Sequence, residues 1–466
     1  MNSKDTIAAI ATAAGSSGIG IIRISGDEAF SVGERIFKRA GKKSKDEKNL
    51  PGDMEEEPRK VCYGYIYDGE ELIDEVLVIV MKGPYSYTAQ DTVEIDCHGG
   101  VLVMKRILET AIRNGARPAE PGEFSKRAFL NGRIDLSQAE AVMDLISAQN
   151  EYALKSSASQ LRGSVLRKVK ELREKLLYEA AFIESALDDP EHVSLEGYPG
   201  ELEKRLRPVI GEIENLVRSS GNGKVMKEGV RTVIIGKPNA GKSSLLNVLV
   251  GEERAIVTDI AGTTRDILEE HIQLEDISLN VVDTAGIRDA KDAVEKIGVS
   301  RAMSAAEEAD LIIYVVDASV PLDENDRNIM KLIRGRKAVV LLNKTDLAIV
   351  VTPEELEEIT GYPVICISAK EETGIGELER KVKSMFYEGV IDFNNQIYIT
   401  NIRHKTALTE SLKSLKMVME SIRSGLPEDF YTIDLMAAYE QLGRIIGESV
   451  EEDLVNEIFG RFCMGK

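Results

Sequence analysis

The chain has 466 residues, which predicts about three domains, and its 43% apolar and 30% charged residues are typical of a protein that can bury substantial cores. A net charge of −20 argues against broad electrostatic binding to nucleic acid, so an RNA substrate would need a local basic patch or a partner protein. No apolar run approaches the ~18 residues of a membrane span, and the N-terminus lacks a signal-peptide core, so we expect a cytoplasmic protein.

The N-terminal segment is predicted to form a compact α+β domain over residues 1–120. Apolar runs at 6–10 and 21–24 flank the glycine-rich segment 15–20, which indicates a strand, a hairpin turn and a second strand. Such a pattern of glycines is by itself weak support for phosphate binding. The charged segment 40–60 predicts a mobile surface loop.

Three further strands and a helix complete the predicted N-terminal domain. The dipeptide Asp68-Gly69 predicts a hairpin turn between strands at 61–67 and 73–81. Apolar and acidic residues alternate over 92–96, which places them on opposite faces of a strand. A helix is expected to start at Gly99-Gly100 and to end near Asn114.

Helical patterning takes over from Ser137 onward. Apolar residues at spacings of three and four from Leu154 to Ile183 predict one continuous stripe, which the sequence Asp188-Asp189-Pro190 ends. A second helix is expected up to Val217, followed by a flexible linker at 219–223.

Helices return after Asn401, and Ser449-x-x-Glu452 predicts the start of a last short helix. Between the two helical segments, residues 230–385 alternate strand and helix as in a doubly wound sheet. Each helical flank has an apolar stripe that needs a partner. We therefore expect the flanks to bury each other, which makes the domain between them an insertion.

A phosphate-binding loop is predicted at Gly236–Ser243. It follows an apolar strand and opens a helical pattern, which is the setting that the P-loop signature requires. Backbone N–H groups of such a loop face one point at the positive end of a helix. Lys242 then reaches the β- and γ-phosphates, and the Ser243 hydroxyl can hold Mg²⁺. The alternative, a chance glycine turn, is contradicted by the motifs that follow.

Four more motifs follow in order, three of them directly after a predicted strand. The segment 262–266 supplies a threonine that can close over Mg²⁺ and the γ-phosphate, and Asp283–Gly286 places a carboxylate in the second shell of the metal. In Asn343–Asp346 one carboxylate can accept both the ring N–H and the exocyclic amine of guanine, which selects GTP over ATP. Ser368–Lys370 adds backbone donors for the guanine oxygen.

Two positions in these motifs leave alternatives open. Ile287 stands where many switch GTPases have a water-orienting glutamine, so another group must orient the water. Glu295 is the best nearby carboxylate, although a solvated helix glutamate explains it too. The amide oxygen of Asn239 could ligate a monovalent cation beside the phosphates, and the alternative is an asparagine that stabilises a turn.

Together these residues make the chain resemble the MnmE/TrmE family of tRNA-modifying GTPases, nearly end to end. The GTPase motifs are shared with many relatives, whereas the N-terminal blocks and the Cys-x-Gly-Lys end single out this family. The segments that carry the resemblance are 5–7, 20–26, 98–100, 117–118, 121–125, 127–131, 236–244, 259–266 and 462–466.

The resemblance implies a multidomain fold and a function. The fold is an α+β folate-binding domain that dimerises (1–120), an all-α helical domain (121–222 and 389–466) and an inserted Ras-like α/β P-loop GTPase domain (223–388). Members act with a FAD-containing partner, called MnmG or GidA. Together they add a carboxymethylaminomethyl or aminomethyl group at C5 of the wobble uridine of certain tRNAs, using a tetrahydrofolate in the 5-formyl or methylene form.

The resemblance also implies roles for single residues. It places Arg23, Glu94, Arg133 and Lys466 at the folate, Mg²⁺ on Ser243 and Thr264, and K⁺ on Asn239, Thr258, Ile260 and Thr263. Glu295, Lys242 and Thr264 are the candidate catalytic residues. The candidate GTP-binding residues are Asn239, Ala240, Gly241, Lys242, Ser243, Ser244, Thr258, Asp259, Ile260, Ala261, Gly262, Thr263, Thr264, Asp283, Thr284, Ala285, Gly286, Asn343, Lys344, Asp346, Ser368, Ala369 and Lys370.

The four cysteines, Cys62, Cys97, Cys366 and Cys463, are far apart and lack metal-ligand spacing, so we expect reduced thiols. Cys463 has two interpretations, chemistry near the folate or a buried structural thiol. The chain departs from the family at 13–18, where many members have Pro-Pro-Gly-Arg-Gly-Gly, and at 89–91. Two rival functions are a ribosome-assembly or signalling switch that modifies nothing, and a folate-binding regulatory protein.

Overall fold

The described residues of the computed structural model form two compact units, one made of 1–143, 160–181 and 436–466, the other of 144–159 and 182–435. None of the described helices combines the length and the hydropathy that a membrane span requires. The structure describes residues 5–13, 15–40, 60–148, 150–254, 269–274, 277–282, 306–386, 397–448, 450, 452–462 and 465.

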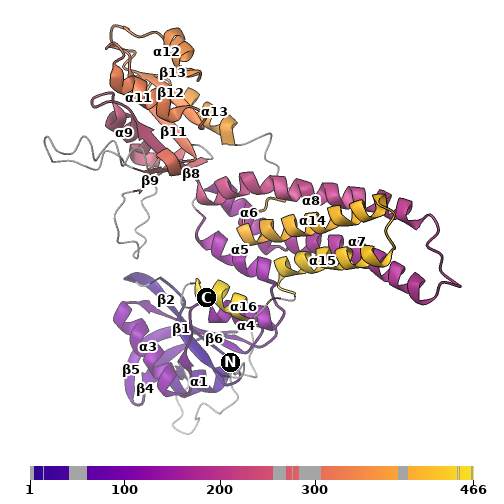
Figure 1. Ribbon diagram of the computed structural model, residues 1–466. Coiled ribbons are helices and arrows are strands. Elements are labelled where there is room, and N and C mark those ends of the chain that lie inside the picture. Colours follow the sequence, from indigo (N-terminus) through magenta and orange to yellow (C-terminus); the bar gives the residue numbers. More distant parts are fainter. Residues whose placement is uncertain are drawn as a thin grey trace. The chain divides into compact units, whose positions relative to one another are not determined.

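The N-terminal domain is a seven-stranded sheet in the order β3-β4-β5-β6-β2-β1-β7, with helices on one face (Figure 1). The predicted hairpins and the helix after Gly100 are confirmed, whereas α1, β3 and β7 were not predicted. The two missed strands have only three and two residues and form through distant partners. The elements are β1 Ile7–Ile10, β2 Ser17–Ser25, α1 Ala29–Ile36, β3 Phe37–Arg39, β4 Val61–Asp68, β5 Glu71–Met81, β6 Thr92–Gly99, α3 Val101–Arg113 and β7 Arg117–Pro118.

The two faces of this sheet differ in what covers them. Alternate strand residues such as Val78 and Ile95 are fully buried under α1 and α3. On the other face of β4 and β5, Val61 and the cross-strand pair Tyr63 and Leu77 are 60%, 47% and 44% exposed. The alternation predicted for 92–96 is confirmed, because Val93 and Ile95 are buried and Glu94 and Asp96 are not. On β4 and β5 the side opposite the helices carries an apolar strip. The predicted loop at 40–60 lies almost entirely outside the described residues.

The chain's last helix packs on the segment that follows this sheet. Helix α4 (Glu123–Leu130) and helix α16 (Glu452–Gly460) meet where Lys126 Nζ donates to Asn456 Oδ1 at 2.6 Å. Gly122, with a φ of +67°, has no room for a Cβ against the Phe459 carbonyl. The predicted last helix is confirmed, while Ser449 lies outside the described residues.

A buried carboxylate anchors the start of α4. Glu123 is 4% exposed, and its Oε1 accepts from Arg117 at 2.6 Å and from Arg127 at 2.9 Å. Burial alone would raise the pKa of Glu123, but these guanidinium groups and the Glu120 N–H lower it to about 2. Since Arg127 also donates to the Asp5 carbonyl at 2.6 Å, this network ties α4 to the first residues of the chain.

Replacing Glu123 by glutamine is expected to destabilise the protein by about 3 kcal/mol at pH 7. Because the folded-state pKa lies below the ordinary value of 4.5, this stability is present above about pH 5 and is lost as the pH falls from about 5 toward 2. Urea unfolding of the full chain at pH 7 and pH 3.5 measures the difference. Glu120→Gln, an exposed neighbour, is the control. An equal loss of stability at both pH values would contradict the electrostatic explanation.

The predicted helices are confirmed except at two points, whereas α4 was not predicted. The stripe from Leu154 to Ile183 is not one helix, because α6 (Glu151–Leu161) and α7 (Ser164–Asp188) are separate. Gly163 between them has a φ of +79°, a conformation that interrupts a helix. Helix α5 (Leu136–Ile146) precedes them, and α7 ends at Asp188 as predicted.

The flexible linker predicted at 219–223 is wrong, because α8 (Tyr198–Glu228) runs through it. A Cβ at Gly223 would collide with the carbonyl of Ile399, and the Ile399 N–H donates to Ser219 Oγ at 3.3 Å. The glycine and serine residues therefore allow close packing of the helix against another segment. Composition alone cannot separate this use of small residues from flexibility.

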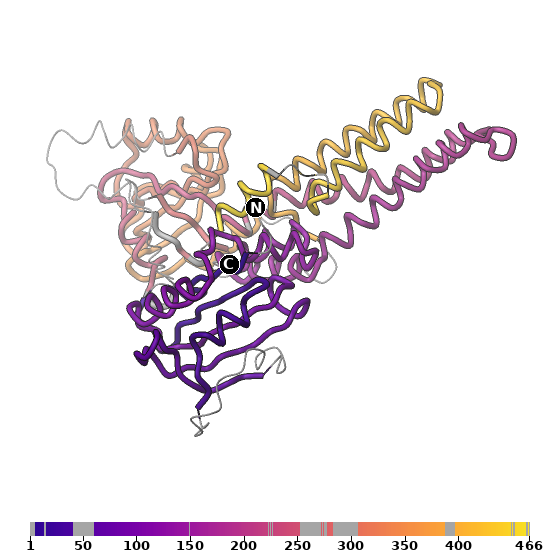
Figure 2. Tube along the Cα trace, turned by 90° about the horizontal axis from the view of Figure 1, so that it is seen from below, coloured from indigo at the N-terminus to yellow at the C-terminus, as the bar shows by residue number. Residues whose placement is uncertain are grey.

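Helices from both sides of the nucleotide-binding domain pack on each other, as expected. Helix α8 runs alongside α14 (Ile402–Arg423) in both views (Figures 1 and 2), and Lys416 Nζ lies 2.9 Å from Glu214 Oε1 between them. Leu408 and Leu415 of the predicted stripe are fully buried. The α/β domain is thus an insertion in a helical domain, which continues with α15 (Asp429–Ile446).

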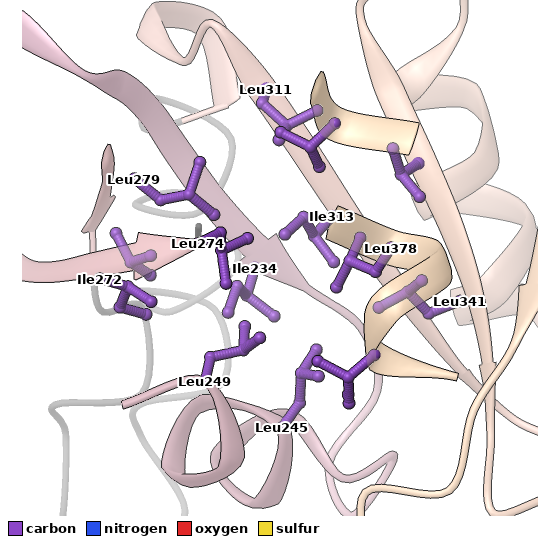
Figure 3. Close-up of a cluster of buried hydrophobic side chains, with 14 of the residues drawn as sticks. Ile234, Leu245, Leu249, Ile272, Leu274, Leu279, Leu311, Ile313, Leu341 and Leu378 are labelled. Carbon is purple, nitrogen blue, oxygen red and sulfur yellow. The ribbon is translucent and has the colours of Figure 1, made fainter. Parts of the chain in front are cut away.

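The inserted domain is a six-stranded sheet in the order β13-β12-β11-β8-β10-β9, parallel except for the edge strand β9. Figure 3 shows Leu245 and Leu249 of α9 and Leu378 of α13 directed at strand residues Ile234 and Ile313. The predicted doubly wound domain is confirmed. Its elements are β8 Val230–Ile235, α9 Lys242–Arg254, β9 Glu269–Leu274, β10 Ile277–Val282, β11 Leu311–Asp317, α11 Glu324–Ile333, β12 Ala338–Asn343, α12 Pro353–Thr360, β13 Val364–Cys366 and α13 Ile375–Phe386.

Candidate functional site

The candidate nucleotide site lies at the carboxyl ends of the parallel strands, where α/β sheets bind ligands. The loop between β8 and α9 turns through three residues with positive φ, Gly236 at +155°, Asn239 at +63° and Gly241 at +98°. A Cβ at Gly236 would meet the Val315 carbonyl of β11. The glycines are therefore needed for the loop to lie close to the sheet and to open α9 at Lys242.

Lys242 lies across this loop. Its Nζ donates to the carbonyls of Gly236 at 2.8 Å and Lys237 at 2.7 Å. Burial lowers the pKa of Lys242. A phosphate that enters the loop offers this ammonium a charged acceptor in place of two neutral carbonyls, which is a stronger hydrogen bond.

Asn343 joins three of the predicted motifs. Its Nδ2 donates to the Ala240 carbonyl at 2.9 Å, and the Ala369 N–H donates to its Oδ1 at 3.0 Å. The side chain is 2% exposed, and a Cβ on Gly241 would collide with it. One buried amide therefore fixes the phosphate loop, the end of β12 and the Ser368–Lys370 segment relative to one another.

The two residues that follow Asn343 shape the base site. Lys344 has a φ of +66°, a strained conformation that is common at functional sites. Its Nζ lies 2.5 Å from Asp317 Oδ2. Asp346 Oδ1 accepts from Ser368 Oγ at 2.8 Å. This hydrogen bond orients the carboxylate that the sequence assigns to guanine. Asp317 was missed in the sequence, although it ends β11 at the same sheet edge.

The remaining candidate residues of the nucleotide site differ in exposure, and many lie outside the described part of the chain. Within the loop, Asn239 and Ser243 are exposed, which suits an amide oxygen and a hydroxyl as cation ligands. The left-handed φ of Asn239 also fits the turn-stabilising alternative, because asparagine is enriched in that conformation. Ser244 and Lys370 are exposed, and Ala240 and Ala369 are buried. Candidates outside the described residues are Thr258, Asp259, Ile260, Ala261, Gly262, Thr263, Thr264, Asp283, Thr284, Ala285, Gly286, Glu295 and Lys466, as are Ile287 and Cys463.

The candidate folate residues gather around one tyrosine of the N-terminal domain. The guanidinium carbons of Arg23 and Arg133 lie 5.3 and 5.1 Å from the centre of the Tyr87 ring. Arg23 Nε donates to Glu94 Oε1 at 2.6 Å across the paired strands β2 and β6. The sequence predicted three of these four; Tyr87 was missed because no strand or helix marks its loop.

Two further features of this cluster fit a pterin with a charged tail. Asp96, two residues from Glu94 on the same strand, has a buried Oδ1 without a partner among the described residues, and burial and Glu94 raise its pKa. Amino groups of an aminopyrimidine ring are suitable donors for such an oxygen. Arg23 Nη1 also donates to the Gly465 carbonyl at 3.3 Å, so the end of the chain returns to this domain, as a role for Lys466 requires.

Cys62, Cys97 and Cys366 are free thiols, as expected, and burial raises the pKa of Cys97 to about 11. No group of three histidine, cysteine or acidic side chains in the described part of the chain is arranged to hold a metal.

The fold and the motif geometry define a P-loop guanine-nucleotide-binding protein with an inserted nucleotide domain. The family model described as "MnmE helical domain" matches residues 136–463, and the model described as "GTP-binding protein TrmE N-terminus" matches residues 6–133. The chain belongs to the MnmE family of tRNA modification GTPases.

Relatives match along their whole length. The tRNA modification GTPase MnmE of Lachnoclostridium phytofermentans is 57% identical over 462 residues, which is 99% of each chain. The MnmE proteins of Alkaliphilus oremlandii and Acetivibrio thermocellus are 49% and 47% identical and cover 99% and 100% of both chains.

Proposed function

We propose that the protein hydrolyses GTP and, with a FAD-containing partner of the MnmG/GidA type, modifies C5 of the wobble uridine U34 in certain tRNAs. The added group is carboxymethylaminomethyl or aminomethyl, and a one-carbon tetrahydrofolate supplies its methylene when bound. The observation that carries the proposal is the end-to-end similarity to proteins named tRNA modification GTPase MnmE. The arrangement of two separate clusters, one for a nucleotide and one for a pterin, supports it.

In the nucleotide site, the Lys242 ammonium offsets negative charge on the β- and γ-phosphates. The Asp346 carboxylate accepts hydrogen bonds from the ring N–H and the exocyclic amine of guanine. The buried Asn343 holds the loop and the base motif together, which supports this assignment. Ser243 and Thr264 hold Mg²⁺, and Asn239, Thr258, Ile260 and Thr263 ligate K⁺. GTPase activity that is equal in NaCl and KCl would contradict the potassium assignment.

Glu295 positions the attacking water, because the apolar Ile287 cannot do so. We expect Glu295→Ala to reduce the GTP hydrolysis rate about 100-fold in potassium, with the GTP dissociation constant nearly unchanged. Single-turnover hydrolysis and equilibrium binding separate the two quantities. Hydrolysis at the parental rate would remove this role from Glu295.

In the N-terminal domain, Arg23, Glu94, Arg133 and Lys466 bind the folate. Carboxylates suit the aminopyrimidine edge of the pterin, and cations suit the carboxylates of its tail. The contacts of Arg23 with Glu94 and with the Gly465 carbonyl support a pocket that includes the chain's end. In this proposal the N-terminal domain ends at 120, and the GTPase domain spans 223–388 between the two parts of the helical domain.

The protein acts as a homodimer through its N-terminal domain. The exposed strip of Val61, Tyr63 and Leu77 supports this, because a second copy would bury the same residues on both sides. Analytical ultracentrifugation of the full chain tests it: Leu77→Asp should yield monomers, whereas a monomeric parental protein would contradict the proposal.

Nucleoside analysis of tRNA from a deletion strain tests the function directly. Loss of the C5 group at U34 with restoration by the parental gene is the expected result. Wobble uridines that are unchanged from those of the parental strain would favour a ribosome-assembly or signalling switch, or a folate-binding regulator.

A further inference from the structure

We propose that Lys237 is a positioning residue that holds the phosphate-binding loop against the start of α11, and that this contact sets the affinity for the phosphates of the nucleotide. The inference rests on the proposed GTP site. Lys237 belongs to the loop itself, yet its Nζ lies 2.6 Å from Asp326 Oδ2 and 3.1 Å from Asp323 Oδ2. The side chain is 14% exposed and is directed at α11.

The two carboxylates are fixed without help from Lys237. Asp323 Oδ1 accepts from the N–H groups of Asn325 at 2.9 Å and Asp326 at 3.2 Å, and the Asp323 N–H donates to Asp326 Oδ2 at 3.0 Å. This is a reciprocal cap of α11. The lysine therefore binds to a pre-formed acceptor.

The acceptor is also joined to the central sheet. Tyr314 of β11 is fully buried, and its hydroxyl donates to Asp326 Oδ1 at 3.0 Å. Asp326 is 1% exposed, so each of its oxygens lies among protein atoms. Tyr314 pairs in register with Ile235, the last residue of the strand that leads into the loop. Lys237 therefore connects the loop, through Asp326 and Tyr314, to β11, which pairs with the strand β8 that leads into the loop.

The contacts of Lys237 with Asp323 and Asp326 pair one cation with two carboxylates. The pKa of Asp323 is lowered, mainly by its hydrogen bond to Lys237. Water screens the contact with Asp323, which is 52% exposed, much more than the contact with Asp326, which is 1% exposed.

The backbone of the same residue supports the loop. The Lys237 carbonyl accepts from Lys242 Nζ at 2.7 Å and from the Ala240 N–H at 3.3 Å. The far end of the loop is held by Asn343 through the Ala240 carbonyl. The loop therefore has two anchors, α11 through Lys237 at its start and β12 through Asn343 at its end. The backbone N–H groups of the loop need such support if they are to converge on a phosphate, because small displacements of these groups reduce the affinity for the nucleotide.

Lys237→Met removes the cation and keeps most of the length of the unbranched side chain. We expect it to weaken GDP binding at least about 10-fold and to accelerate GDP release, measured with a fluorescent GDP analogue in the full chain. GMP, which lacks the phosphate deepest in the loop, should lose much less affinity, so the ratio of GDP to GMP affinity falls. Lys237→Arg keeps the cation and should retain most of the parental ratio of GDP to GMP affinity. Lys331→Met, on the exposed side of α11, is the control.

Lys237→Met also leaves the buried Asp326 without its cation, so the fold itself could suffer. The double variant Lys237→Met/Asp326→Asn removes that charge and should recover the unfolding temperature while GDP binding stays weak. Parental GDP affinity in either methionine variant would overturn the inference, as would equal losses for GDP and GMP. If the parental protein binds no guanine nucleotide at all, the proposed GTP site fails instead.

Discussion

Asp346→Asn is expected to exchange guanine recognition for xanthine recognition. The carboxylate has one oxygen held by Ser368 at 2.8 Å, which orients it to accept both the ring N–H and the amine of guanine. Asparagine replaces one acceptor oxygen by an NH₂ donor. This donor opposes the exocyclic amine of guanine, whereas xanthine has an acceptor oxygen at the same position. Two hydrogen bonds to a charged group contribute roughly 1.5–3 kcal/mol each, so GTP should bind about 100- to 10,000-fold more weakly.

Competition binding of GTP and XTP to the Asp346→Asn variant and to the parental protein measures this exchange. The control is Glu371→Gln, which also replaces a carboxylate by an amide, at an exposed residue near Ser368. It should leave the affinities for GTP and XTP unchanged. If Asp346→Asn still preferred GTP over XTP, the guanine contact would have to lie elsewhere.

Lys242→Met is expected to reduce kcat/KM for GTP at least about 100-fold. The ammonium is partly desolvated within the loop, where a charge interacts more strongly with phosphate than in water. Methionine keeps the apolar stem and removes the charge. Since the contact is to the β- and γ-phosphates, GMP affinity should change little.

Steady-state hydrolysis and GMP binding by the Lys242→Met variant test this assignment together, with Lys331→Met as the matched control. A variant that hydrolyses GTP normally would show that the loop does not place Lys242 at the phosphates. A large loss of GMP affinity would indicate a collapsed loop rather than a lost contact.

Much of the nucleotide site could be predicted from the sequence because its parts are local. The P-loop and three of the four motifs after it stand at the ends of apolar strands, and a doubly wound sheet collects such ends at one edge. The glycines at 236 and 241 and the asparagine at 343 needed no knowledge of distant contacts to be selected. Their mutual contact through Ala240 follows from the topology.

The positioning residues could not be predicted, because their roles arise from contacts between distant segments. Lys237 reads as a polar loop residue until α11 places Asp326 beside it. Tyr87 reads as a loop tyrosine until Arg23 and Arg133 approach its ring. The serine and glycine residues at 219–223 read as a linker because close helix packing and flexibility use the same small residues.

The most direct test of the account is the binding of GTP and ATP to the purified full chain in Mg²⁺ and K⁺, measured by calorimetry. A site that pairs Asp346 with guanine should bind GTP and discriminate against ATP by at least about 1,000-fold, because adenine offers neither of the two donors that the Asp346 carboxylate accepts from. A protein that bound neither nucleotide, or bound ATP as tightly as GTP, would contradict it.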